Sequence, residues 1–230
     1  MKTYANGIDT RHQILYACKE LFYEKGFHET SYEDICQKSH VSRRTIYYHF
    51  KEKEDIRYEV LWEWTTQMRH LAERYCDRSE YTFSLAMYLA WECSLRDEKY
   101  RKFQLDYYRD FPVYDPKCGT GRFYRIGFGQ MYGHIWSLDR IPPIAFASVY
   151  GYITGMYWMM CEHPKIYSAK DLLYYCMFWG ASIWGIPSET IGQLWLDLEG
   201  YIDQFPEDLL SEMKFYNDAG ESVALVSQTV

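Results

Sequence analysis

The chain has 230 residues with 25 basic and 32 acidic side chains, which gives a formal net charge of −7. This length suffices for one helical protein with a small and a large domain and a sizeable core. The negative balance excludes a protein that holds nucleic acid through bulk positive charge. Aromatic residues make up 19% of the chain, including 24 Tyr and 8 Trp, which is more than a core alone requires.

A first helix is predicted to begin at Asp9 or Thr10, either of which can cap it, and to run to about Lys25. Gly26 follows as the residue that ends it. Its apolar side chains recur at helical spacing and are Ile14, Ala17, Cys18, Leu21 and Phe22. We expect this helix to cover the two that follow.

A short second helix is predicted from Tyr32, because Ser31 and Asp34 have the spacing of a capping box. Its inward-pointing residues would be Ile35 and Cys36, and the polar run Lys-Ser-His ends it. The helix is therefore short and has one apolar side.

The next stretch predicts a turn and a third helix, which together make a helix-turn-helix. Val41 is the apolar residue of the turn, and Ser42 can cap a helix from Arg43 to about His49. The N-terminal residues of such a recognition helix meet base edges in the major groove of DNA. Residues 1–60 hold ten basic and ten acidic side chains, whereas residues 38–53 hold five basic and one acidic. A basic strip on a neutral domain suits docking into a DNA groove.

Helical spacing continues through the rest of the chain. A long helix from near Lys53 presents apolar residues at Ile56, Val60, Leu61, Trp64, Met68 and Leu71. Further helices are expected at about 81–95, 98–110, 122–137, 144–161, 168–184, 188–203 and 207–216. No strand alternation competes with this pattern, so the predicted fold class is all-α.

Two uncharged stretches, from Ile141 to Cys161 and from Leu172 to Ser188, approach the length that spans a membrane. The first contains Pro142-Pro143 and several polar residues, and neither has a cluster of Lys or Arg at one end. We therefore interpret them as buried central helices and expect no membrane partner. Gly151 and Gly155 would then allow close helix packing.

The seven cysteines include no C-x-x-C pair and lie at Cys18, Cys36, Cys76, Cys93, Cys118, Cys161 and Cys176. This pattern indicates reduced, mostly buried thiols in a cytoplasmic protein and no metal or redox centre. The opening sequence, MKTYANGIDTRHQ, has no apolar segment of the kind that a secretory signal needs.

The N-terminal motifs resemble those of the tetracycline-repressor-type (TetR) family of bacterial transcriptional regulators. The matching residues are Leu21-Phe22, Lys25-Gly26-Phe27, Val41-Ser42, Thr45-Ile46-Tyr47, His49-Phe50 and Lys53-Glu54. The chain departs from the family pattern at His40, where Gly is usual, at Arg44, where Gly or Ala is common, and at Glu52, where Ser, Asn or Asp usually caps the fourth helix. The resemblance implies a homeodomain-like, three-helix DNA-binding domain followed by a helical domain that binds a ligand and dimerises.

The candidate DNA-binding residues follow from this pattern. Arg43 and Arg44 are candidates for guanine contacts, with phosphate contacts or plain solvation as the alternative. Thr45 is in line for a base or phosphate, and Tyr32 for a phosphate. By resemblance to the family, Tyr47 points its hydroxyl to DNA, Tyr48 faces DNA, and His49 and Lys53 contact phosphate. The complete set is Tyr32, Ser42, Arg43, Arg44, Thr45, Tyr47, Tyr48, His49 and Lys53.

The aromatic surplus in the second half admits two interpretations. The residues could simply pack the core, or they could line a cavity for a flat or cationic small-molecule effector. The resemblance implies a ligand pocket and so adds support to the cavity, although for any single residue packing remains the first interpretation. Its candidate residues are Trp91, Phe103, Tyr107, Tyr108, Phe128, Tyr132, Tyr152 and Met156.

The sequence thus predicts three regions: a DNA-binding domain at 1–55, a ligand-binding and dimerisation domain at 56–217, and a flexible tail at 218–230. The predicted function is that of a ligand-responsive regulator that binds a palindromic operator on double-stranded DNA as a homodimer. By resemblance to the family, repression relieved by a small molecule is the default direction, with activation as the alternative. By resemblance, the helices near 168–184 and 188–203 form the dimer surface, where Gly180, Ala181 and Ser182 allow close approach. Trp179, Trp184, Trp195 and Leu196 would supply its apolar area.

Two other classes of protein remain open. One is an architectural or protein-interacting DNA-binding factor without a ligand, which predicts an interior filled by aromatics. The other is an enzyme with a DNA-binding head, but no catalytic motif or cofactor signature supports it. We expect no enzymatic activity, no cofactor and no metal.

Overall fold

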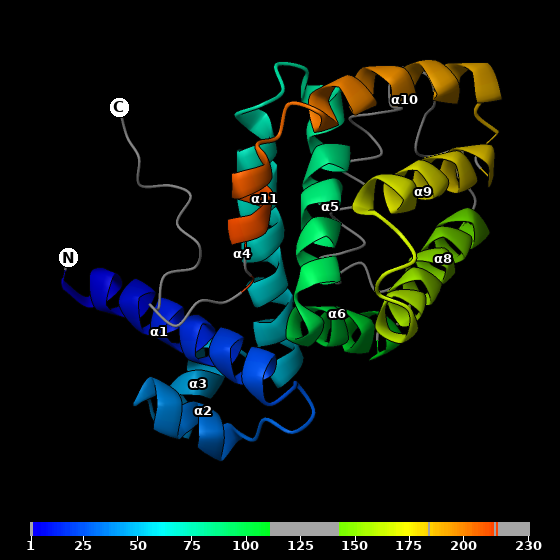
Figure 1. Cartoon of the computed structure of the whole chain (residues 1–230). Coiled ribbons are helices and arrows are strands. Elements are labelled where there is room, and N and C mark those ends of the chain that lie inside the picture. Colours follow the sequence, from blue (N-terminus) through cyan, green and yellow to red (C-terminus); the bar gives the residue numbers. More distant parts are fainter. Residues whose placement is uncertain (1, 111–142, 184, 214, 216–230) are drawn as a thin grey trace. The chain divides into compact units, whose positions relative to one another are not determined.

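The computed structural model describes residues 2–110, 143–183, 185–213 and 215, and every regular element in these ranges is an α-helix (Figure 1). The predicted all-α class is therefore confirmed. In chain order the helices are α1 (Lys2–Glu24), α2 (Tyr32–Ser39), α3 (Arg43–His49), α4 (Lys53–Glu73), α5 (Ser79–Arg96), α6 (Glu98–Asp110), α8 (Pro143–Glu162), α9 (Ala169–Ile183), α10 (Ser188–Ile202) and α11 (Glu207–Glu212).

The chain divides into two compact units. The first comprises Met1–Trp64 and Phe215–Val230, and the second comprises Thr65–Lys214. Helix α4 is one continuous helix whose first half belongs to the first unit and whose second half belongs to the second. The peptide backbone therefore links the two units through a helix.

The core of the first unit is built from the apolar sides of α1 to α4. Its buried residues include Ile14, Ala17, Cys18, Phe22, Ile35, Ile46, Phe50, Ile56 and Val60. Leu21, which was expected on this side of α1, is only half-buried. Helices α2 and α3 pack on one another as a helix-turn-helix, and their predicted first residues, Tyr32 and Arg43, are confirmed.

The predicted start of α1 at Asp9 or Thr10 is wrong, because the helix already begins at Lys2. The preceding residues contain no proline, and Ala5 is a strong helix former. Gly7 is unfavourable within a helix by only about 1 kcal/mol, so it does not end the helix. A residue that can cap a helix therefore does not mark its first turn when the residues before it are also able to adopt the helical conformation.

The second unit is arranged around α5, whose residues from Tyr81 to Leu89 are all buried. Helices α6, α9, α10 and α11 pack against α5, and α8 packs against α6 and α9 (Figure 1). The predicted helix ranges are confirmed to within two residues, except that α11 ends at Glu212 rather than at 216 because Met213 is extended. The predicted helix at 122–137 and the predicted tail lie outside the described residues.

The central helix is thus α5 and not, as we expected, the helices of the two uncharged stretches. Helix α8 exposes Trp158, and α9 exposes Trp179. A Cβ atom added to Gly151 or Gly155 would meet no atom of the described neighbouring elements within 4 Å, so these glycines do not mediate close packing between the helices that the structure describes. No helix among the described residues is both long and apolar enough to cross a lipid bilayer.

Candidate nucleic-acid interface

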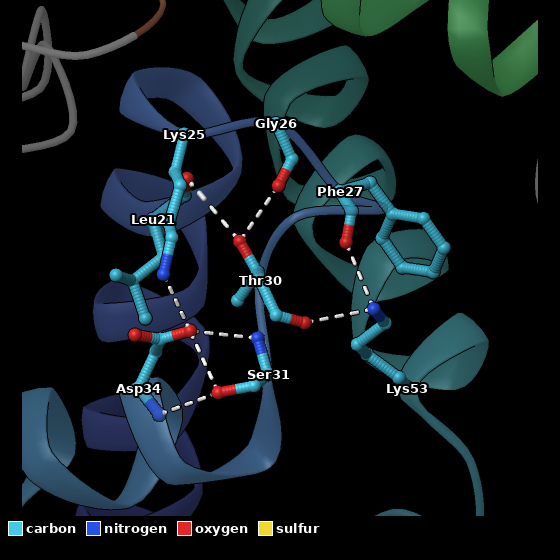
Figure 2. Close-up of polar contacts among 8 residues, drawn as sticks. All are labelled: Leu21, Lys25, Gly26, Phe27, Thr30, Ser31, Asp34 and Lys53. Atoms are coloured by element: carbon cyan, nitrogen blue, oxygen red, sulfur yellow. Dashed lines mark hydrogen bonds and ion pairs between the residues drawn. The ribbon is translucent and has the colours of Figure 1, made fainter.

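A hydrogen-bonded loop between α1 and α2 sets the position of the helix-turn-helix (Figure 2). The loop begins at Gly26, whose φ of 93° lies in the left-handed region that favours glycine. The buried Thr30 hydroxyl donates to the Gly26 carbonyl at 2.7 Å. Lys53 donates from Nζ to the carbonyls of Phe27 and Thr30, each at 2.8 Å, and so ties the loop to the start of α4.

The start of α2 is fixed by the predicted capping box. The Asp34 amide donates to Ser31 Oγ at 3.1 Å, and the Ser31 amide donates to Asp34 Oδ2 at 2.8 Å. Lys25 Nζ lies 2.7 Å from the same carboxylate oxygen (Figure 2). Its hydrogen bond, followed by those from Ser31, holds the pKa of Asp34 well below its ordinary value.

The turn between α2 and α3 contains a departure from the usual glycine. His40 ends α2 with φ 55° and ψ 28°, and it is the one non-glycine residue with positive φ among the residues described. This left-handed conformation is unfavourable for a residue with a Cβ atom. Ser42 then caps α3 as predicted, because its Oγ accepts from the Thr45 amide at 3.2 Å.

Helix α3 exposes four of the nine predicted DNA-binding residues to solvent, which are Arg43, Arg44, Tyr47 and Tyr48. Arg44 is exposed and makes no hydrogen bond or ion pair with other described residues, and Tyr48 is 84% exposed. Thr45 is half-buried, with its hydroxyl 2.8 Å from Ser42 Oγ. On the opposite side of the helix Ile46 is fully buried. The helix therefore has one anchored side and one side free to meet a partner.

Arg43 is exposed but ordered by two tyrosines. Its Nη2 donates to the Tyr47 hydroxyl at 3.3 Å, and its guanidinium carbon lies 5.0 Å from the centre of the Tyr32 ring. The rings of Tyr32 and Tyr47 are 5.0 Å apart. The sequence did not indicate Glu33, whose carboxylate lies 4.0 Å from Arg43. Its place in the first turn of α2, next to Tyr32, is the signal that could have found it.

His49 and Lys53 are less exposed than the residues on the open side of α3. His49 is half-buried, with its ring against those of Tyr48 and Phe50. Lys53 is also half-buried, and its ammonium lies 4.4 Å from the centre of the Phe27 ring. Burial is the main cause that lowers the pKa of Lys53. Two of its three N–H donors serve the loop, which leaves one for an external partner.

The aromatic residues predicted to line a cavity are mostly buried in the second unit. Trp91 of α5, Phe103, Tyr107 and Tyr108 of α6, and Met156 of α8 are all buried. Tyr108 stacks on Tyr157 at 5.1 Å and meets Tyr107 edge-on at 5.4 Å. Tyr107, Tyr108 and Tyr157 thus pack on one another, and together with the other buried side chains of α5, α6 and α8 named here they are called the aromatic cluster.

Three of the predicted cavity residues do not belong to the described cluster. Tyr152 lies on another side of α8, where its ring stacks on Trp179 of α9 at 6.0 Å. This follows from the helix period, because residues two apart, such as Tyr150 and Tyr152, point in different directions. Phe128 and Tyr132 lie outside the described residues.

None of the cysteines that the structure describes forms a disulfide. Burial raises the pKa values of Cys18 and Cys76, and raises that of Cys176 to about 12. These thiols are therefore protonated at neutral pH. No group of three His, Cys, Asp or Glu residues in the described ranges is placed to hold a metal ion.

Residues 14–60 match the family model described as bacterial regulatory proteins, tetR family. The chain is 47% identical over 47 residues to the HTH-type transcriptional regulator UidR of Escherichia coli K12. This match covers 20% of this chain and 24% of UidR. The chain is also 39% identical over 62 residues to the HTH-type transcriptional regulator AcrR of Shigella flexneri. That match covers 27% of this chain and 28% of AcrR. The matches thus span about a quarter of the length of these relatives.

Two solved structures match the chain at TM-scores below 0.5 and at low sequence identity. One is NalD, the secondary repressor of the MexAB-OprM multidrug efflux pump in Pseudomonas aeruginosa, with a TM-score of 0.41 and 21% identity over 79% of this chain and 97% of NalD. The other is a γ-butyrolactone receptor described as an ArpA-like protein, with a TM-score of 0.42 and 16% identity over 86% of this chain and 98% of the receptor.

Proposed function

Because the N-terminal domain of this chain belongs to the tetR family of bacterial regulatory proteins, we propose that the whole protein is a ligand-responsive transcriptional repressor. In this proposal it binds a palindromic operator as a homodimer and is released by a small molecule. The observation that carries the proposal is α3, a capped helix that is buried through Ile46 and exposes Arg43, Arg44 and Tyr48.

The proposed contacts to DNA follow from the exposure of each side chain. Arg43 and Arg44 meet guanine edges or phosphates, and Tyr48 makes an apolar or phosphate contact in the groove. Lys51 and the remaining N–H of Lys53 add positive charge beside the helix. The first four amides of α3 are partly satisfied by Ser42, so this end keeps a partial positive charge toward the phosphates.

Homodimer formation through α9 and α10 is supported by exposed apolar side chains. Trp179 is 52% exposed and Leu196 is 62% exposed, and the two helices pack on one another. Large apolar side chains gathered on a surface commonly mark an interaction site. Gly180 and Ala181 are buried within the chain, so the close approach that they allow is to helices of the same chain. Trp184 lies outside the described residues.

A small-molecule effector would act in the second unit, where the aromatic cluster offers ring faces to a flat or cationic compound. Helix α4 belongs to both units, so a change around its second half can reorient its first half. In a dimer this changes the separation of the two recognition helices and lowers the affinity for a fixed operator. The proposed mechanism is a shift between two conformations with different operator affinity.

A second candidate function is that of a DNA-binding factor without an effector. The burial of Trp91, Phe103, Tyr107 and Tyr108 favours it, because side chains that pack on one another fill the interior. A thermal-shift screen with aromatic and cationic compounds separates the two candidates. A compound that raises the melting temperature and weakens DNA binding supports the repressor, and the absence of any shift supports the effector-free factor.

The DNA-binding proposal is tested by fluorescence anisotropy with the DNA upstream of the protein's own gene and with scrambled DNA, at two salt concentrations. Wild type should bind the upstream DNA more tightly, and Arg43→Ala should reduce this preference. Lys165→Ala, which removes one exposed positive charge from the loop between α8 and α9, serves as the control for handling and concentration. Equal binding of wild type to both DNAs, followed by no enriched sequence in a selection from random DNA, would contradict the proposal.

The dimer proposal is tested by sedimentation of Leu196→Lys beside Ile166→Lys. Both side chains are about equally exposed, but Ile166 lies in the loop between α8 and α9. Leu196→Lys should shift the protein toward the monomer and weaken binding to a palindrome, whereas Ile166→Lys should not. A wild type that is monomeric at micromolar concentration and still binds a palindrome tightly would contradict the dimer.

A further inference from the structure

The guanidinium of Arg43 lies beside two tyrosine rings that come from different helices. Its central carbon is 5.0 Å from the ring centre of Tyr32, in the first turn of α2, and 5.7 Å from that of Tyr47 in α3. Both distances are within the range of a cation–π interaction. Arg43 Nη2 also donates to the Tyr47 hydroxyl at 3.3 Å. The Glu33 carboxylate, at 4.0 Å, adds a solvent-exposed ion pair. An exposed arginine that would otherwise sample many rotamers thus has four attractions, two of them from tyrosine rings.

This arrangement leaves the guanidinium able to bind a base. A ring face attracts the cation without using an N–H donor, and the Tyr47 hydroxyl uses one of five. A guanine edge needs two N–H donors in a fixed fork. Arg44, by contrast, is exposed without a hydrogen bond or ion pair to other described residues. Arg43 is therefore the better ordered of the two candidate base readers.

The protonation states keep the cluster intact at physiological pH. Burial, followed by the neighbouring Tyr47, raises the pKa of Tyr32 to about 12, so its phenol is neutral. The hydrogen bond to Tyr47 raises the pKa of Arg43 above its ordinary value, so the guanidinium is charged. A neutral ring facing a permanent cation is the combination that the interaction requires.

We propose that Tyr32, which lies outside the recognition helix, is a positioning residue that sets the base preference of Arg43. The inference rests on the proposed function, because it assumes that α3 reads DNA. Tyr32 orients the guanidinium for one base, so its effect is confined to the base pair that Arg43 contacts. A merely structural role of Tyr32 would instead weaken binding to all sequences alike.

The experiment is a selection of binding sites from random duplex DNA with the full-length protein. The variants are Arg43→Ala, Tyr32→Leu and Tyr32→Phe, with Tyr167→Leu in the α8–α9 loop as a matched exchange in the second unit. Arg43→Ala identifies the operator position that it reads by the loss of preference there. Tyr32→Leu should lower the preference at that position by about two- to five-fold, the effect of an exposed cation–π contact. Tyr32→Phe keeps the ring and should retain it.

The outcomes separate this inference from the proposed function. If wild type enriches no sequence, the proposed function fails and the inference fails with it. If wild type enriches an operator but Tyr32→Leu keeps the full preference at the Arg43 position, or loses preference evenly, only the inference fails. A loss of preference in Tyr32→Phe equal to that in Tyr32→Leu also overturns it, because the ring is then not the cause. Melting curves identify a variant that fails to fold. In that case Tyr47→Phe, which removes the hydroxyl group that accepts from Arg43, tests the arrangement of Arg43 with its two tyrosines through the preference at the operator position that Arg43 reads.

Discussion

Replacing Lys53 with methionine removes the ammonium that ties the α1–α2 loop to α4 and retains most of the side-chain stem. Two charge-assisted hydrogen bonds of 2.8 Å are lost, to the carbonyls of Phe27 and Thr30. Each such bond contributes about 1.5–3 kcal/mol when it is shielded from water. Lys53 is only half-buried, so water replaces part of this and we expect a total loss of about 2 kcal/mol in the free energy of unfolding.

Urea denaturation measures the loss in the free energy of unfolding of Lys53→Met. The salt dependence of DNA binding shows whether Lys53 also contacts a phosphate. Each phosphate contact contributes about 0.9 to the slope of log affinity against log salt concentration. We expect Lys53→Met to unfold at lower urea concentration, because the loop is released, and to lower this slope by at most about 0.9, because only its remaining N–H can meet a phosphate. Lys51→Met is the matched control for the urea measurement alone, since Lys51 is exposed and its side chain has no hydrogen bond or ion pair among the described residues. Unchanged stability of Lys53→Met with a slope reduced by about one would refute the reasoning.

Three further substitutions test the geometry of the helix-turn-helix. His40→Gly should raise the free energy of unfolding by about 0.5–1 kcal/mol in urea, because φ 55° is strained for histidine and not for glycine. Ser42→Ala should lower it by about 1 kcal/mol and weaken DNA binding, because α3 loses its N-cap. Asp34→Asn should lower the free energy of unfolding at neutral pH, and the free energy of unfolding of this variant should decrease less steeply as the pH is lowered. The pKa of Asp34 is lower in the folded than in the unfolded protein, so its contribution is complete above the unfolded value of about 4 and is lost as the pH falls toward the folded value.

Each of these substitutions has a control or an opposing outcome. Gln37→Gly, an exposed change within α2, should lower the free energy of unfolding by about 1 kcal/mol, because glycine is unfavourable inside a helix. If His40→Gly lowers it by the same amount, the left-handed conformation of residue 40 is not strained. Ser42→Thr keeps a hydroxyl acceptor and should keep most of the stability. For Asp34, an acid-unfolding curve of Asp34→Asn that parallels the wild-type curve below pH 4 would count against the capping carboxylate.

The helix-turn-helix was predictable from sequence because its determinants are local. Ser31 with Asp34, and Ser42 with Thr45, are three residues apart, so capping can be inferred from spacing alone. The same holds for the buried positions Ile35 and Ile46, which follow the helix period. The left-handed conformation of His40 was also foreseeable, because glycine is usual at that position in the family.

The partners of Arg43 and Lys53 were not predictable, because they depend on residues from other segments. Lys53 donates to carbonyls 23 and 26 residues earlier in the chain, and no pattern in the sequence encodes backbone oxygens that a loop leaves free. The proximity of Tyr32 to Arg43 depends on the packing of α2 against α3. In the second unit, composition predicted many aromatics but not which of them, such as Tyr152, would pack outside the main cluster.

Phe215 has a consequence for any attempt to isolate the DNA-binding part as a fragment. This residue is fully buried within the first unit, although more than 150 residues separate it from Trp64, against whose ring it packs edge-on at 5.3 Å. Its ring also meets Tyr23 and the ammonium of Lys19. A polypeptide that stops after the first half of α4 would expose the Trp64 indole and leave a ring-sized hole beside α1. A miniature DNA-binding protein derived from this chain therefore needs a substitute for Phe215, either as an added peptide or as a larger side chain introduced on α1.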